Sequence, residues 1–222
     1  MKTLKSEETR QKILDSALAL FREKGFESAT MREIATNAEA ATGAAYYYYP
    51  SKDAIVLDFY RQSSAEMRGK IEAAIEGVSG LERRLLALIG VKLTQFAPNR
   101  GVLRALLRSG ADPRDPVSPF SKESAEIRDA DIAWFAAILS DCGVRISKDL
   151  EPHLPGLLWF FQMGVIFFWV VDESAGQART ERLLRLAVKS VVTLVKLAGL
   201  PLMRPVRKKT VEIVELVKGA SS

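Results

Sequence analysis

The stretch Thr30–Lys52 reads TMREIATNAEAATGAAYYYYPSK and decides the fold of the N-terminal region. Thr30 is followed three residues later by Glu33, which is the pattern of a capping box and marks the start of a helix. Pro50 disfavours helical conformation at the residue before it, so a second short helix must end there. Two short helices joined by a tight turn predict a helix-turn-helix motif over residues 30–49.

Helical patterns flank this motif on both sides. Before it, Ile13, Ala17 and Phe21 recur at the spacing of one helix face and predict an amphipathic helix over residues 9–24. Gly25 follows as a helix C-terminal residue. After the motif, Ser51 is a helix cap, and a long helix is predicted over residues 52–76.

The remainder of the chain has helical periodicity and no strand-like alternation. We therefore expect an all-α fold, with a three-helix helix-turn-helix domain over residues 7–67 and a C-terminal helical bundle over residues 68–222. Further helices are predicted over residues 81–96, 99–109, 121–141, 149–171, 178–197 and 206–217, the last packing through Val206, Ile213 and Val217.

The composition is that of a globular protein, with 48% hydrophobic and 27% charged residues in a chain of 222. The net charge of +5 permits a nucleic-acid partner. Up to residue 60, however, eight Lys and Arg stand against nine Asp and Glu. Any DNA-binding face in this region must therefore depend on the local placement of charge and on backbone donors.

Catalytic and metal-binding patterns are absent from the sequence. Cys142 is the only cysteine and His153 the only histidine, which excludes an intrachain disulfide and a cysteine metal cluster. No phosphate-binding, nucleophile-elbow or zinc-protease motif occurs, so we expect neither an enzyme nor a cofactor. The N-terminus lacks the apolar segment of a signal peptide, and we expect a cytoplasmic protein.

One segment requires a membrane test. Residues 157–171 read LLWFFQMGVIFFWVV and are almost continuously apolar. The run is shorter than the roughly 20 residues of a spanning helix, and it contains Gln162. A buried helix is the preferred interpretation, and we expect no membrane partner.

Four ordered elements resemble the TetR family of transcriptional regulators. They are the first helix TRQKILDSALALFREKGF, the segment TMREIA, Gly43 with Tyr46 in the second short helix, and YYPSKDAI. The resemblance extends from Thr9 to about Phe59, and the rest of the chain matches the family only in length and helical character. It implies a homodimeric, ligand-responsive DNA-binding regulator, most simply a repressor of a palindromic operator in double-stranded DNA.

A recognition helix places its first residues at base edges in the major groove. Phosphate contacts at the rim of the groove fix the register of the protein. The resemblance implies a phosphate contact for Tyr46 and a DNA-backbone contact for Lys52. The predicted DNA-binding residues are Thr30, Met31, Arg32, Thr42, Gly43, Ala44, Tyr46, Tyr47 and Lys52.

The motif departs from the family pattern at three positions. Glu39 stands where the family has a turn glycine, and Ala40 replaces the usual valine. Ala41 replaces the usual Ser or Thr cap, at a cost of about 1 kcal/mol in cap stability. We expect Thr42 to cap in its place. Few side chains here hydrogen-bond bases, which predicts modest sequence discrimination and a large share from phosphate contacts and DNA shape.

The apolar helix over residues 149–171 must be buried on all sides, which a second copy of the chain explains. The predicted dimer interface contains Trp159, Gly164, Phe168, Leu183, Leu186 and Val191. By resemblance, a ligand pocket lies among the helices between residues 81 and 171, and few ionisable groups there favour a small hydrophobic effector. The predicted pocket residues are Phe96, Leu103, Trp134, Phe160, Met163 and Phe167.

Two alternatives stay open at the level of sequence. The first is a membrane-associated helical protein, which the apolar run at residues 157–171 would explain. The second is a helical ligand-binding protein without DNA binding, which the N-terminal charge balance and Ala41 would explain.

Overall fold

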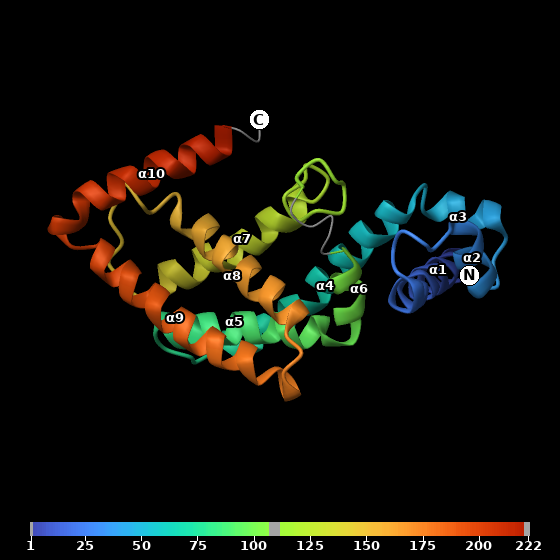
Figure 1. Ribbon diagram of the computed structural model, residues 1–222, viewed down its shortest axis with the longest axis horizontal. Helices are drawn as coiled ribbons and strands as arrows, with labels where there is room; N and C mark the ends of the chain where they lie inside the picture. Colours follow the sequence, from blue (N-terminus) through green and yellow to red (C-terminus); the bar gives the residue numbers. More distant parts are fainter. Residues whose placement is uncertain (1, 107–111, 220–222) are drawn as a thin grey trace. The chain divides into compact units, whose positions relative to one another are not determined.

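The computed structural model describes residues 2–106 and 112–219, and within these it contains helices, turns and no strand (Figure 1). The all-α prediction is confirmed. The elements in chain order are α1 (Lys2–Lys24), α2 (Met31–Asn37), α3 (Thr42–Tyr48), α4 (Lys52–Ile75), α5 (Leu81–Phe96), the 3-10 turn η1 (Ala97–Asn99), α6 (Arg100–Leu106), α7 (Ala125–Asp141), α8 (Leu154–Val171), η2 (Ala175–Gln177), α9 (Ala178–Ala198), η3 (Pro201–Met203) and α10 (Arg204–Gly219). Residues 107–109, which the sequence assigns to a helix, lie outside the described residues.

The chain forms two compact units that are not contiguous in sequence. The first comprises Met1–Glu66 with Gln95–Ile127, and the second comprises Met67–Thr94 with Arg128–Ser222. The segment after α5 belongs to the first unit because Val102, Leu106 and Val117 are buried in the same apolar core as α1 and α2. The predicted boundary at residue 67 divides α4 as the units do, but it assigns residues 95–127 to the other side.

Helix α1 begins at Lys2, seven residues before the predicted start at Thr9. Its last turn is closed as the sequence indicates. Gly25 has φ +86° and its N–H donates to the Phe21 carbonyl at 3.1 Å. Phe26 then folds back onto Phe21, with ring centroids 5.1 Å apart. This contact sets the direction in which the chain enters α2.

The turn between α2 and α3 holds a backbone conformation that is unfavourable for its residue. Glu39 has φ +53°, in the left-handed region that glycine adopts without a steric penalty. On the α3 side of the turn, Ala41 is the N-cap and makes no side-chain cap hydrogen bond. The expectation that Thr42 caps the helix was therefore wrong, because Thr42 already has helical conformation as the first residue of α3.

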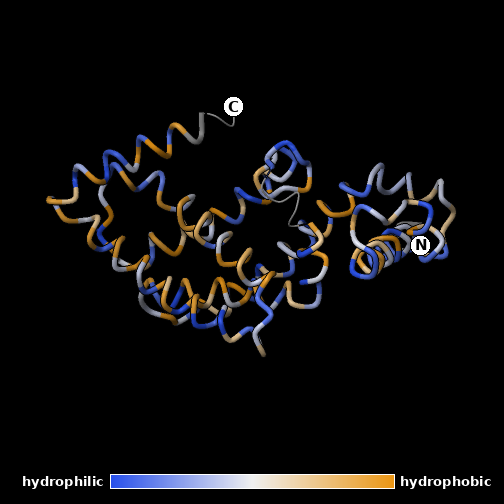
Figure 2. The backbone as a smooth tube through the Cα atoms, in the orientation of Figure 1, coloured by the Kyte–Doolittle hydropathy of each residue, from blue (hydrophilic) through white to orange (hydrophobic). Residues whose placement is uncertain are grey.

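Helix α8 is predominantly apolar, and Figure 2 colours the chain by hydropathy. By length and composition it is the one helix among the described residues that could cross a membrane, and 50% of it is buried inside the chain. The expectation of burial on all sides is not met within one chain, because one face stays exposed. That face carries Phe160, Gly164, Phe168 and Val171.

Helix α10 turns away from α9 after Gly199, at an angle of 97° (Figure 1). Arg207 anchors it, with Nε donating to Asp149 at 3.1 Å and Nη1 to the Ala198 carbonyl at 2.7 Å. The predicted packing through its apolar face is not found. Val206 is 53% exposed and Ile213 60%. The side chain of Val217 lies outside the described residues.

Replacing Glu39 with glycine is expected to stabilise the protein. Glycine removes a left-handed strain of roughly 1 kcal/mol, and part of that gain is offset because glycine increases the entropy of the unfolded chain. Chemical denaturation measures the change. Glu27 is the matched control, since it is an exposed turn residue with a negative φ. Glu27→Gly should destabilise, and the same sign of change for both variants would contradict the explanation.

Candidate nucleic-acid interface

Helix α3 has one buried residue and an otherwise accessible surface. Ala45 is 0% exposed and packs into the core, while Tyr46 and Tyr47 are 52% and 81% exposed. Thr42 and Gly43 are also exposed. The predicted recognition residues, with the half-buried Ala44, therefore belong to one short helix. Ala45 packs this helix onto the core, and its opposite side is exposed to solvent.

The N-terminus of α2 is closed by the predicted capping box. The Thr30 Oγ1 accepts from the Glu33 N–H at 3.3 Å, and the Thr30 N–H donates to Glu33 Oε2 at 2.9 Å. Lys24 also pairs with Glu33. Hydrogen bonds from Lys24 and Thr30 lower the pKa of Glu33 to about 2. The Thr30 N–H and hydroxyl thus both donate to Glu33, and the contact of Thr30 with DNA stays a prediction.

The other predicted contacts at this end differ in exposure. Met31 is buried, with only 7% exposed, so only its backbone could reach a partner. Arg32 is exposed. Lys52 is half-buried, and its ammonium donates to the carbonyls of Phe26 at 2.7 Å and Glu27 at 3.2 Å. Lys52 ties the start of α4 to the turn before α2, leaving one N–H for a DNA backbone contact.

A buried carboxylate holds the C-terminal end of α3. Asp58 on α4 is 4% exposed. Its two oxygens accept from Arg10 Nη2 on α1 and from the Tyr49 hydroxyl, each at 2.6 Å. Gln62 adds a third donor at 3.2 Å. Burial and the bond to Asp58 raise the pKa of Tyr49, so its hydroxyl stays a donor.

The sequence reasoning missed this network. Asp58 entered the sequence analysis only as one of the nine acids up to residue 60. The available signal was an acid inside the apolar run Ile55–Phe59, because a carboxylate is buried in such a run only when it is paired. A second missed group is Lys92, which lies on the buried face of α5 one turn after Leu88 and Ile89 and is itself buried.

The predicted pocket residues fall into both units. Phe96 and Leu103 pack against the core of the first unit. The ring centroids of Phe96 and Phe59 are 6.1 Å apart. Trp134, Met163 and Phe167 are half-buried in the second unit. Phe160 is 53% exposed on the outer face of α8, which does not suit a pocket residue.

Of the predicted interface residues, Trp159 is only 4% exposed and belongs to the core of its own chain. The other five retain exposed surface. Gly164, Phe168 and Leu186 are exposed, and Leu183 and Val191 are partly exposed. Phe160 joins them, since it lies four residues before Gly164 on the same face of α8.

The capped α2, the turn and the open α3 on a three-helix core define a helix-turn-helix protein with a second helical unit. Residues 13–59 match the bacterial regulatory proteins, tetR family, and residues 84–212 match the Tetracyclin repressor-like, C-terminal domain. The second match covers more than half of the chain. The chain belongs to the TetR family.

Curated relatives agree with this assignment. The transcriptional repressor KstR of Mycolicibacterium smegmatis is 32% identical over 190 residues, covering 83% of this chain and 87% of that protein. The regulator UidR of Escherichia coli is 24% identical over 106 residues, covering 48% of this chain. The match to UidR spans only about half of that relative's length, 54%.

Solved structures share the fold at low sequence identity. A TetR-family regulator from Syntrophomonas wolfei has a TM-score of 0.66 at 20% identity, covering 84% of this chain and 96% of that one. FadR from Bacillus subtilis, in complex with stearoyl-CoA, has a TM-score of 0.62 at 18% identity, covering 86% and 98%.

Tyr49→Phe is expected to destabilise the first unit by about 1–3 kcal/mol, because it removes a buried donor from the Asp58 carboxylate. Thermal and chemical denaturation measure the loss. Tyr48→Phe is the matched control, since the Tyr48 hydroxyl forms a part-buried hydrogen bond with Ser6 at 3.1 Å and is not bonded to a buried charge. We expect the control to change stability by less than about 0.5 kcal/mol. Equal effects of the two variants would show that Asp58 does not depend on Tyr49.

Proposed function

We propose that the chain is a transcriptional repressor that binds a palindromic operator as a homodimer and leaves it when a small hydrophobic effector binds. The observation that carries the DNA-binding role is the open outer side of α3, where two tyrosines are exposed beside Thr42 and Gly43. The repressor KstR, as a relative that covers most of the chain, supports the sign of regulation. A repressor of chromosomal DNA acts in the cytoplasm.

Gly43 supports close approach of α3 to DNA. Beyond its neighbours and the backbone of α3 itself, a Cβ added there would meet no atom within 4 Å, so packing against other elements does not require glycine. A helix without a side chain at this position can bring its backbone nearer to the floor of the groove. The Tyr46 hydroxyl then donates a hydrogen bond to a phosphate oxygen, and Tyr47 reaches base edges or the sugar backbone.

The proposed interface has little free positive charge. Lys24 pairs with Glu33, and Lys52 already binds two carbonyls. Arg32 is the exposed cation on α2 and the natural partner for a phosphate. We infer modest discrimination between sequences, with much of the affinity coming from phosphate contacts and DNA shape.

A gel shift with DNA from upstream of the chain's own gene tests the proposal, with a scrambled duplex as comparison. Arg32→Gln should weaken binding to both duplexes to a similar degree and reduce the slope of log affinity against log salt by about 1. Lys122→Gln is the control, an exposed cation of the same unit. Absence of binding to any upstream fragment would instead favour a ligand-binding protein without DNA binding. A cognate preference of many orders of magnitude would contradict modest discrimination.

Exposed apolar side chains on α8 and α9 support the homodimer. Phe160 is 53% exposed on α8, and Leu186 and Leu194 are 58% and 61% exposed on α9. The helices pack against each other. Large apolar side chains exposed on two helices that pack together favour an interaction site. Two copies joined through the exposed apolar residues of α8 and α9 would form a four-helix interface. This dimer would place two α3 helices on one DNA duplex.

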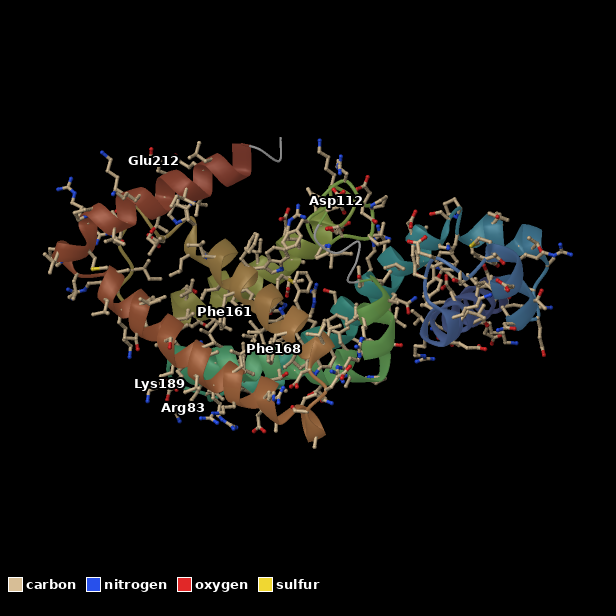
Figure 3. All side chains as sticks on the ribbon, viewed as in Figure 1. Arg83, Asp112, Phe161, Phe168, Lys189 and Glu212 are labelled. Carbon is tan, nitrogen blue, oxygen red and sulfur yellow. The ribbon has the colours of Figure 1, made fainter. Side chains whose placement is uncertain are left out.

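Leu194→Glu is expected to convert the dimer to a monomer at micromolar concentration, because it puts a carboxylate among the exposed leucines of α9. Light scattering measures the mass, and the gel shift should weaken in parallel. Lys189→Glu, which replaces an exposed charged residue of α9 (Figure 3), should leave the mass and the gel shift unchanged. A wild-type chain that is monomeric at this concentration would refute the homodimer.

Helix α4 is the proposed route between effector and DNA. Its first part, with Ile55 and Phe59, is buried in the first unit, and its last part, with Met67 and Ile71, is buried in the second. An effector that prefers one position of α4 shifts the population toward it and changes the separation of the two α3 helices.

A further inference from the structure

A buried polar cluster in the second unit joins side chains from three helices. Lys92 on α5 pairs with Asp131 Oδ1 on α7 and donates to Gln162 Oε1 on α8 at 2.5 Å. Gln162 Nε2 donates to Asp131 Oδ2 at 2.8 Å. Lys92 and Gln162 are each 1% exposed. The two oxygens of one carboxylate are thus held by two separate donors, an ammonium and an amide.

The cluster is costly for a helical core. Burial lowers the pKa of Lys92, and the contact with Asp131 opposes that shift. The Phe135 ring lies 5.2 Å from the ammonium and adds a cation–π contact. An apolar residue of similar size would fill this position without the desolvation penalty. Because Lys92 costs stability where an apolar residue would not, we examine it as a group that binds a ligand.

Exposure distinguishes the members of the cluster. The Asp131 side chain keeps 22% of its surface exposed, against 2% for Lys92. Asp131 can therefore move into water, whereas Lys92 cannot. Trp134 lies three residues further along α7, on the neighbouring turn of the helix, and is half-buried.

We propose that Lys92 and Gln162 form a carboxylate-binding site for a small apolar acid, and that Asp131 occupies this site when no ligand is bound. The ligand carboxylate replaces Asp131 and accepts from the Lys92 ammonium and the Gln162 amide, while its apolar body packs beside Trp134. The small apolar acid would be the effector of the proposed repressor. Its effect on DNA binding rests on that proposed function. The sequence-based expectation of a purely hydrophobic effector is narrowed to a hydrophobic acid.

Competition with a tethered carboxylate sets the selectivity. Asp131 is held near the two donors at a high effective concentration, so a short acid cannot displace it. A ligand competes only when burial of its apolar body adds to the binding free energy. Removing Asp131 should therefore strengthen the binding of acids, which no purely structural role of the ion pair would produce.

The test uses the full-length protein and the matched probes decanoate and decanol, below their aggregation limits. Tryptophan fluorescence reports binding, since Trp134, Trp159 and Trp169 all lie in the second unit. We expect wild type to prefer decanoate. Lys92→Met should weaken decanoate binding roughly tenfold or more and leave decanol unchanged, as loss of a charge-assisted hydrogen bond predicts.

Asp131→Ala should bind decanoate about tenfold more tightly than wild type, because the internal competitor is gone. Acetate should also raise its melting temperature, since acetate replaces the missing carboxylate beside Lys92. Asp129→Ala, an exposed acid on the same helix, is the control and should behave as wild type. If Asp131→Ala does not fold, Asp131→Asn is measured in its place, with the same expected direction.

Equal binding of decanoate and decanol by wild type would overturn the proposal, as would unchanged or weaker decanoate binding on removal of the Asp131 carboxylate. The gel shift is read separately. Decanoate binding without any DNA binding would sustain the site and refute the repressor, whereas operator binding with no preference for the acid would do the reverse.

Discussion

The Asp58 carboxylate is the interaction on which the helix-turn-helix depends. It is buried on α4 and binds Arg10 from α1 and Tyr49 from the end of α3. A buried charge without partners would cost several kcal/mol, so the three helices must meet in the one arrangement that satisfies both oxygens. Pro50 ends α3 directly after Tyr49, and the network then fixes where that end lies. The open side of α3 is thereby held on a rigid base.

Local signals in the sequence were sufficient to predict the motif. The capping box at Thr30 was confirmed because its four-residue pattern is satisfied by contacts within those residues. The turn after α1 followed from Gly25 for the same reason. The Glu39 conformation shows that local propensity can be overridden, since packing of α2 on α3 requires a left-handed residue where the sequence has no glycine.

Long-range features were harder to predict because they depend on partners far away in sequence. Asp58 and Lys92 interrupt apolar helix faces, and periodicity alone does not name the groups that neutralise them. The return of residues 95–127 to the first core has no local signal either, since Val102 and Val117 suit any apolar environment. The apolar run of α8 was correctly predicted to be a helix, but which face is buried depended on α9. The sequence therefore did not show that Trp159 would be buried within the chain and Phe160 exposed.

Each unit contains a carboxylate that is hydrogen-bonded to donors from other helices, but the two carboxylates differ in exposure and in the number of donors. Asp58 is 4% exposed and has three donors, so any movement of it leaves buried groups unpaired. Asp131 has two donors and an exposed edge, so water can solvate it when another carboxylate takes its place. The Asp58 arrangement suits a rigid DNA-binding unit. The Asp131 arrangement suits a contact that a ligand carboxylate can replace. An effector that replaces Asp131 can shift a conformational equilibrium only by the difference between its binding free energies for the two states.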